Sequence, residues 1–276
     1  MRYSFPICVA AGALAAVIAA APALGQRIEP LDLYDLPPAD VVVLGEVHDN
    51  PVQHANQALA VEAIGATALV FEMLTDRQAL RITPELLQSE TALEQALGWN
   101  ESGWPDFAMY YPIFTAAPSP VIFGGAVERE VARRAVTEGA AAVFGAGAPL
   151  FGLNEALDDS EQSDREAGQM AAHCDALPEQ MLAGMVEAQR LRDAALARAV
   201  IAAYAETAGP VALITGNGHA RADWGVPRAL LRAAPDLRVL SIGQLEHAED
   251  AAMPYDLWLF TEPARRDDPC EGFADR

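Results

Sequence analysis

Residues 40–48 decide the fold of this protein, and they read Asp-Val-Val-Val-Leu-Gly-Glu-Val-His. Three valines and a leucine follow one another without a polar side chain between them. Such a run predicts a strand buried on both faces, which is typical of a parallel sheet covered by helices. The strand is followed at once by Gly45-Glu46-Val47-His48, a glycine turn with two titratable side chains. The chemistry of the protein is therefore expected where this strand ends.

The next segment completes the pattern of a βαβ unit. A helix is expected from about residue 54 to 64, where it meets Gly65. A second apolar strand is expected at 68–71, and it ends at Glu72. A strand, a helix and a strand at this spacing predict parallel strands joined by a crossover helix.

Strands and helices continue to alternate along the chain. Further strands are expected at 120–123, 211–214, 239–242 and 257–260. A short helix is expected to open at Thr83-Pro84-Glu85, and further helices are expected at 90–97, 128–138, 160–172 and 178–207, the last opened by Pro178 and ended by Gly209. The predicted fold class is α/β, with a central, mostly parallel sheet flanked by helices and with helical insertions between the strands.

The amino-terminal end differs from this core. Arg2 precedes an apolar stretch over residues 5–21, and small residues follow up to Gln26. This pattern predicts a cleaved secretory signal peptide in preference to an uncleaved anchor helix, and hence an exported protein, located in the periplasm or at the cell surface. Cys8 lies well before any cleavage point, so the sequence does not support a lipid anchor.

The predicted organisation has a single folded domain between two short ends. The expected parts are a signal peptide at 1–25, a lead-in at 26–39, the domain at 40–262 and a polar tail at 263–276. Removal of the signal leaves Cys174 and Cys270. In an oxidising compartment these two thiols either pair and fasten the tail to the domain, or remain free or separately buried.

The composition excludes several classes of function. The chain has 39 carboxylate and 18 basic side chains, a formal net charge of -21, and all of its basic residues are arginine. Without lysine there is no Schiff-base catalysis, no pyridoxal phosphate anchor and no Walker-type phosphate clamp. The negative charge and the lack of a basic run argue against nucleic acid as a partner.

A second G-x-x-H motif, Gly216-Asn217-Gly218-His219, follows the expected strand at 211–214. Because the carboxyl ends of parallel strands share one edge of a sheet, His48 and His219 are expected to meet there, beside Glu46 and Glu72. A lone histidine after a strand is more often a structural hydrogen-bonding residue, but the matched pair favours a functional site. The remaining histidines, His54, His173 and His247, have no matched partner and are taken as structural.

Five segments in order resemble the ChaN family of haem-binding proteins, which is grouped with the Tiki and TraB proteins and the erythromycin esterases. They are the stretch from Val43 to Pro51, the strand end Phe71-Glu72-Met73, the pair His173-Cys174 with Leu177-Pro178, the helix segment from Met185 to Asp193, and the stretch from Gly216 to Arg221. The resemblance covers most of residues 40–245. It implies an exported haem-binding protein of iron uptake, with non-covalent b-type haem near a homodimer interface and a tyrosine ligand on the iron. An outer-membrane haem or iron receptor is the partner it suggests.

Haem requires an apolar wall, an axial ligand and cations for its propionates. Tyr111, with Tyr110 second, is the expected ligand, because both lie in an aromatic cluster that spans residues 99–114. The competing interpretation is that this cluster only caps the core. For the propionates the expected partners are Arg190, Arg192 and Arg221 together with His48 and His219; Arg190 and Arg192 cannot share a helix face.

The alternative function is a metal-dependent hydrolase of the Tiki or erythromycin-esterase type. His48, Glu46, Glu72 and His219 would then be catalytic, and His48, Glu72 and His219 would hold zinc or manganese. The sequence contains neither the H-E-x-x-H motif of zincins nor the G-x-S-x-G motif of serine hydrolases. A haem-binding protein, rather than an enzyme, is the preferred prediction.

Overall fold

The computed structural model describes residues 25–247, 253–268 and 270–271 of the chain. The predicted signal peptide, apart from Gly25, and the last residues of the predicted tail lie outside this part. Among the described helices, none combines the length and the apolar character that a membrane span needs.

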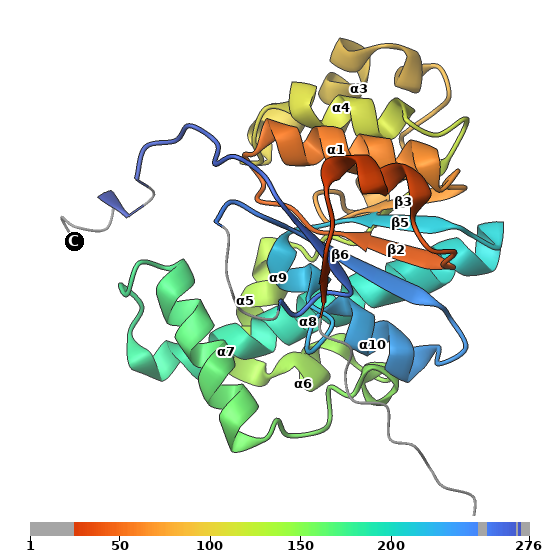
Figure 1. Cartoon of the computed structure of the whole chain (residues 1–276). Helices are drawn as coiled ribbons and strands as arrows, with labels where there is room; N and C mark the ends of the chain where they lie inside the picture. The colour runs from red at the N-terminus through yellow and green to blue at the C-terminus, as the bar shows by residue number, and fades with distance from the viewer. Residues whose placement is uncertain (1–24, 248–252, 269, 272–276) are drawn as a thin grey trace, which may run out of the picture.

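A single sheet of seven strands runs through the molecule, in the order β1-β7-β6-β2-β5-β3-β4 (Figure 1). The strands are β1 (Gln26–Arg27), β2 (Val41–Leu44), β3 (Ala68–Phe71), β4 (Val121–Gly124), β5 (Val211–Ile214), β6 (Val239–Leu245) and β7 (Leu257–Phe260). Every pairing between these strands is parallel. The predicted α/β fold with a central parallel sheet is therefore confirmed.

The apolar strands contribute side chains to two separate hydrophobic cores, one on each face of the sheet. In β2, Val42 and Leu44 point into the core on one face of the sheet, and Val41 and Val43 point into the core on the other. All four residues of β2, and likewise of β3 and β5, are buried. An unbroken apolar strand fits only at such a position, because each of its faces is covered by helices.

Helices form a layer on each side of the sheet, so the fold has three layers (Figure 1). One layer contains α1 (Pro51–Ala63), α3 (Glu90–Leu97) and α4 (Phe107–Thr115), with short α2 (Asp76–Ala79) beside them. The other contains α5 (Arg129–Glu138), α6 (Ala140–Phe144), α8 (Glu179–Thr207) and α10 (Val226–Ala233). Helix α7 (Asp159–Ala172) packs on α8, and α9 (Asn217–Ala220) follows β5. The described residues also form the 3-10 helices η1 (Pro30–Asp35), η2 (Leu86–Gln88), η3 (Trp99–Glu101) and η4 (Ala148–Phe151).

Helix α1 begins three residues earlier than the sequence predicts, at Pro51 instead of about His54. The Asn50 side chain caps it by accepting hydrogen bonds from the backbone N–H groups of Val52 at 3.0 Å and Gln53 at 3.3 Å. Proline at the first position needs no hydrogen-bond partner there. The earlier start brings Gln53 and His54 inside the helix, where both are buried.

The aromatic cluster belongs to the core. The sequence suggests no helix for it, but Phe107–Thr115 forms α4, and Tyr110 and Phe114 are fully buried on its inner side. The Phe114 ring stacks on Phe71 of β3 with 4.1 Å between centroids. The competing interpretation, that these rings cap a core, describes most of the cluster.

The two edges of the sheet extend beyond the predicted strands. Strand β1 lies in the segment expected to be a lead-in, and its Gln26 and Arg27 pair with Leu257 and Trp258 of β7. Strand β6 continues three residues further than predicted, to Leu245, because it pairs with β7 through its polar end. Both extensions depend on pairing with β7, and a local hydropathy pattern does not show which strands pair.

Candidate functional site

The two G-x-x-H motifs lie side by side because β2 and β5 are neighbours in the sheet. The backbone N–H of Asn217 donates to the Glu46 carbonyl at 2.9 Å and so joins the two loops directly. A side chain at position 45 would collide with Asn217, and one at position 216 would lie 2.9 Å from His48 Nε2. The glycines thus allow the loops to approach each other, as their positions after the strands predict.

Glu46 binds His48 from the protein interior. Glu46 is buried; its Oε1 accepts from His48 Nδ1 at 2.7 Å, and its Oε2 lies 3.0 Å from His54 Nδ1. Burial opposes ionisation of this carboxyl, but hydrogen bonds from His48 and His54 hold its pKa below the usual value. Burial also works against a charged His48, yet Glu46 and Glu72 raise the pKa of this imidazole. The His48 side chain is 34% exposed and faces a cleft.

His219 has different surroundings. It is buried between two carboxylates, with its Nδ1 2.6 Å from Asp193 Oδ1 and its Nε2 3.4 Å from Glu72 Oε1. Burial works against the charged imidazole, but Glu72 and Asp193 raise the pKa of His219 to about 10. Glu72 also accepts hydrogen bonds from Thr215 Oγ1 at 2.6 Å and from the Gly216 N–H at 2.8 Å. The two carboxylates therefore favour the protonated form of His219, and both of its ring nitrogens face a carboxylate oxygen.

The cleft above these histidines has a volume of about 1090 Å³, and its walls contain apolar and cationic side chains besides the carboxylates of Glu46, Asp49 and Glu72. Trp104 packs against His48, with 4.9 Å between ring centroids. Apolar lining comes also from Met73, Val127 and Leu196, and positive charge comes from Arg129, Arg192 and Arg266. These three arginines come from α5, α8 and the tail after β7, which are far apart in the sequence.

Neither predicted tyrosine lines this cleft. Tyr110 lies beneath it, and its hydroxyl donates to Glu46 Oε1 at 3.0 Å. Burial, together with the Glu46 charge, raises the pKa of Tyr110 far above its ordinary value of 10, which works against a phenolate. The Tyr111 hydroxyl donates to the Leu87 carbonyl at 3.0 Å, inside the layer formed by α4 and η2. The aromatic cluster suggested these residues, but their helix turns them towards the core.

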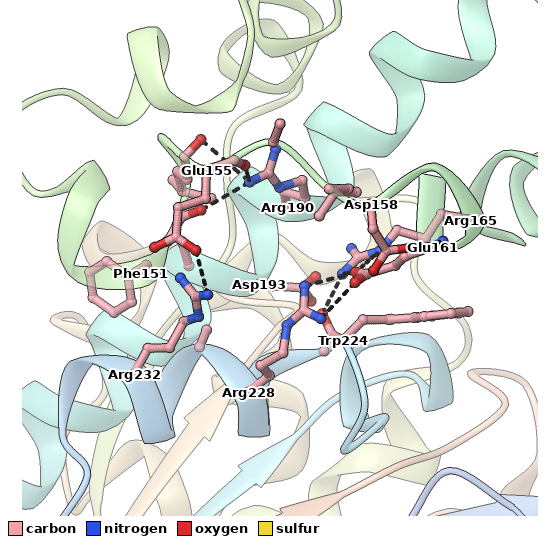
Figure 2. Close-up of a pocket in the computed structure, with 17 residues that line it drawn as sticks. Phe151, Glu155, Asp158, Glu161, Arg165, Arg190, Asp193, Trp224, Arg228 and Arg232 are labelled. Atoms are coloured by element: carbon pink, nitrogen blue, oxygen red, sulfur yellow. Dashed lines mark hydrogen bonds and ion pairs between the residues drawn. The ribbon is translucent and has the colours of Figure 1, made fainter. Parts of the chain in front are cut away.

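Two of the predicted propionate partners also lie elsewhere. Arg190 pairs with Glu187 at 2.6 Å and donates to the Glu155 carbonyl at 2.8 Å, at a separate pocket (Figure 2). Arg221 pairs with Asp223 at 2.7 Å and lies over the Trp224 ring, 3.7 Å from its centroid. Arg192, two residues from Arg190 on α8, is the one that reaches the cleft, in line with the expectation that the two cannot share a helix face.

Asp193 and His54 are site residues that the sequence analysis did not identify. Asp193 is on the same face of α8 as Gln189, and this i, i+4 spacing was a readable signal that both face one partner, which is His219. His54 supports Glu46 from α1, and its Nε2 donates a hydrogen bond to the His48 carbonyl at 2.8 Å. No local pattern marks His54, because the contact depends on how α1 packs on the loop after β2.

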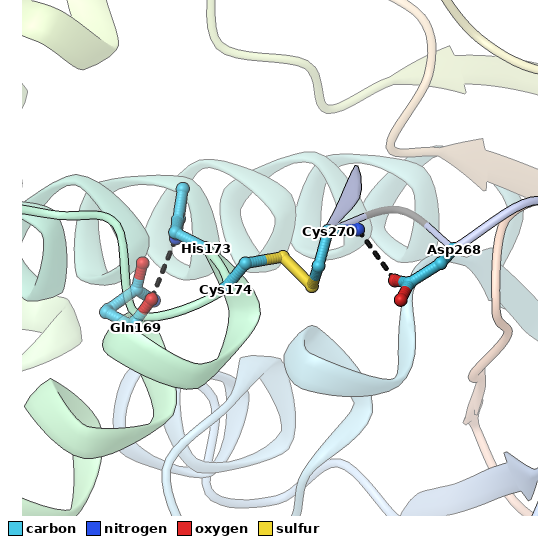
Figure 3. Close-up of a disulfide and its surroundings, with 5 residues drawn as sticks. All are labelled: Gln169, His173, Cys174, Asp268 and Cys270. Carbon is cyan, nitrogen blue, oxygen red and sulfur yellow. Dashed lines mark hydrogen bonds between the residues drawn. A yellow bond between two sulfur atoms is a disulfide. The ribbon is translucent and has the colours of Figure 1, made fainter. Parts of the chain in front are cut away.

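The tail is fastened across one side of the cleft. Arg266 donates to Glu246 at 2.6 Å and to Asp49 at 2.7 Å, and it lines the cleft itself. Further along, Cys270 forms a disulfide with Cys174 at the end of α7 (Figure 3). Of the alternatives left open by the sequence, the paired cysteines are the ones that the structure contains.

A metal ion would need more convergent ligands than the described residues provide. Within these residues, no group of three or more His, Cys, Asp or Glu side chains has the arrangement that could hold a metal ion. The set His48, Glu72 and His219 is thus not assembled as a three-ligand site, because His219 is already engaged by two carboxylates.

Comparisons with known proteins agree with this architecture. Residues 33–230 match the family model described as haem-binding uptake, Tiki superfamily, ChaN. Among solved structures, the chain is similar to ChaN of Campylobacter jejuni, whose structure is described as showing cofacial heme binding. The two align with a TM-score of 0.60 at 17% identity, over 83% of this chain and 89% of that chain. The type III effector HopBA1 aligns with a TM-score of 0.45 at 13% identity, over 82% and 88%. No curated protein sequence matches the chain.

Proposed function

Because the chain belongs to the ChaN family of haem-binding uptake proteins in the Tiki superfamily, we propose that it binds haem in the cleft above His48. The described structure of the Campylobacter jejuni relative concerns heme binding, and it has the same fold. The cleft lies where open α/β sheets usually hold their ligands, at the carboxyl ends of the strands.

The residues of the cleft suit the three parts of a haem molecule. Trp104, Met73 and Leu196 offer an apolar surface to the porphyrin. The guanidinium groups of Arg129, Arg192 and Arg266 suit the two propionates. The volume of about 1090 Å³ is slightly above the range of about 300–1,000 Å³ that is usual for small-molecule sites.

The observation that carries the proposal is the orientation of His48. Glu46 holds its Nδ1 at 2.7 Å, and the side chain is 34% exposed and lines the cleft, with its other ring nitrogen, Nε2, packed close to Gly216. Metal-ligating histidines commonly donate the second N–H to a carboxylate in this way, which fixes the tautomer and makes the ligating nitrogen more basic. His48 is therefore the proposed axial ligand in place of Tyr111, and b-type haem needs no covalent attachment there. When bound, haem would supply an iron atom that can be ligated by His48 Nε2.

Charge is balanced around the ligand although the chain is strongly acidic. The His219 cation lies between Glu72 and Asp193 and offsets part of their negative charge. Without it, two buried carboxylates next to the cleft would repel an anionic porphyrin. His219 thus acts as a positioning and neutralising residue.

A hemin titration tests the proposal. We expect the wild-type protein to give a Soret band at stoichiometric hemin, and His48→Ala to weaken binding about tenfold or more, because a ligand to the iron is lost. His247→Ala, which removes an exposed histidine outside the cleft, is the matched control. Tyr111→Phe separates the two ligand hypotheses: a Soret band that shifts in this variant and not in His48→Ala would assign the iron to Tyr111. No spectral change with wild-type protein would contradict haem binding altogether.

The proposed role is haem or iron uptake or handling by an exported protein, in the periplasm or at the cell surface. The disulfide between Cys174 and Cys270 supports an oxidising compartment. Thiol titration of protein taken directly from cells is expected to find no free thiol in the mature chain, and two free thiols would count against export. A homodimer and an outer-membrane receptor are further parts of this proposal, and sedimentation with and without hemin tests the dimer.

The second candidate is a metal-dependent hydrolase, and one observation favours it. His48 and Glu72 line the same cleft beside Gly216, and imidazole and carboxylate are donors that suit zinc or manganese. Metal analysis of Glu72→Gln distinguishes the candidates. Loss of a bound metal in this variant, with hemin binding absent in the wild type, would favour the hydrolase.

A further inference from the structure

A second pocket lies behind the cleft, on the other side of Asp193. It has a volume of about 310 Å³ and is enclosed by α7, α8, α10 and the segment after η4 (Figure 2). It shares no lining residue with the cleft. Asp193 lines this pocket and also binds His219, so it connects the two.

Arginine is concentrated in the wall of this pocket. Four of the 18 arginines of the chain line it: Arg165, Arg190, Arg228 and Arg232. They offset the four carboxylates of Glu155, Asp158, Glu161 and Asp193, which line it too. The lining of the pocket is therefore formally neutral, although the whole chain has a formal net charge of -21.

Arg165 carries an unused donor. Arg165 is 6% exposed, and its Nε and Nη2 donate to Glu161 Oε1 at 2.8 Å and 2.5 Å. Nη2 also donates to the Trp224 carbonyl at 3.2 Å, whereas Nη1 is buried and has no hydrogen-bond partner among the described residues. An unpaired buried N–H of a charged group is unfavourable, and an oxygen atom brought in by a ligand would satisfy it.

The other arginines of the pocket lie in two groups, Arg228 with Arg165 around Glu161, and Arg190 and Arg232 around Glu155 (Figure 2). Arg228 holds Glu161 with two hydrogen bonds, at 2.9 Å and 2.7 Å, and Figure 2 shows its guanidinium next to that of Arg165, close to Asp193. Arg232 donates to Glu155 at 2.5 Å. Gly152 has a φ of 71°, and a side chain there would collide with the Arg232 guanidinium. Glycine at this position thus lets Arg232 lie along the pocket wall.

We propose that this pocket binds a small oxyanion, a carboxylate or a phosphate, which accepts a hydrogen bond from Arg165 Nη1. Guanidinium groups recognise both kinds of anion through paired N–H donors. The volume of about 310 Å³ suits a metabolite-sized molecule and is far smaller than the cleft proposed for haem. This site is separate from the proposed haem site, and Asp193, which binds His219, is one of the residues that line it.

Calorimetric titration with inorganic phosphate and with succinate, at constant ionic strength, tests the pocket. We expect the wild-type protein to bind one of the two with a dissociation constant of about 1 mM or tighter, and the preferred probe tells phosphate from carboxylate. Arg165→Met and Arg232→Met should each weaken binding about tenfold, the first because it removes the proposed charge-assisted hydrogen bond and the second because it removes a positive charge from the pocket wall. Arg134→Met, at an exposed arginine paired with Glu138, is the matched control and should bind like the wild type.

Two outcomes would overturn the proposal. One is that neither probe binds the wild-type protein below about 10 mM. The other is that Arg134→Met weakens binding as much as Arg232→Met, which would mean a general charge effect. Arg232 is 41% exposed, so its variant remains informative if Arg165→Met does not fold. The imidazole NMR signals of His219 should move when the anion saturates the wild-type protein, and should stay unchanged in Arg232→Met at the same concentration.

Discussion

At the scale of single residues, the same motif produces two histidines with different properties. His48 has one carboxylate partner and an open side, whereas His219 is enclosed by Asp193 and Glu72. Their local sequences are alike, so the difference comes from α8, which supplies a carboxylate to His219 only. The first histidine suits a ligand to iron, and the second suits a fixed positive charge.

Gly216→Ala tests the space beside His48. The backbone accepts alanine there, since its φ is -65°, but the added methyl group would lie 2.9 Å from His48 Nε2. We expect hemin affinity to fall about tenfold and the free energy of unfolding to fall by about 1–3 kcal/mol, as for other overpacked sites. Gly168→Ala, in α7 with open space around it, should bind hemin normally and gain about 0.5–1 kcal/mol. Equal hemin affinity in the two variants would contradict the proposed site.

At the scale of elements, α8 organises both cavities. Gln189, Arg192 and Leu196 lie on the face that lines the cleft, and Arg190 lies on the face that lines the second pocket. Asp193 is between the two faces. Because successive residues of a helix are about 100° apart, one helix can serve two sites with neighbouring residues.

The disulfide belongs to this scale too, since it joins the end of α7 to the tail. Cys174 and Cys270 are 96 residues apart, and closing a loop of this length restricts the unfolded chain. Reduction is expected to lower the free energy of unfolding by about 2–4 kcal/mol, as measured by urea denaturation with and without reductant. The double variant Cys174→Ser, Cys270→Ser should be insensitive to reductant. A wild-type protein that is equally stable in both conditions would show that the disulfide adds no stability.

At the scale of the whole molecule, two arginine–carboxylate pairs tie the ends of the domain to the sheet. Hydrogen bonds from Arg238 lower the pKa of Asp40, at the start of β2, to about 2. Hydrogen bonds from Arg266 lower the pKa of Glu246, just after β6, to about 2. Both carboxylates have ordinary values of 3.8 and 4.5, so each is more acidic in the folded protein than in the unfolded chain.

The sign of the pH dependence follows from these lowered values. The stabilisation is fully present above the unfolded pKa values and is lost as the pH falls from about 4.5 towards about 2. Urea denaturation between about pH 7 and about pH 3 should therefore show a loss of stability on acidification, and a smaller loss in Arg238→Met. Arg77→Met, at an exposed arginine, should keep the wild-type slope. An unchanged slope in Arg238→Met would rule out this contribution from Asp40.

The sequence by itself determined the sheet, because an apolar run such as 41–44 is stable only between two covering layers. It also determined that the two G-x-x-H motifs meet, since parallel strands end at one edge. Only the tertiary structure decided which side chains complete the site. Tyr111 turned inward with α4, Arg192 replaced Arg190 and Arg221 at the cleft, and Arg266 came from the tail. Such contacts depend on helix rotation and on partners distant in the chain, and no local pattern encodes either.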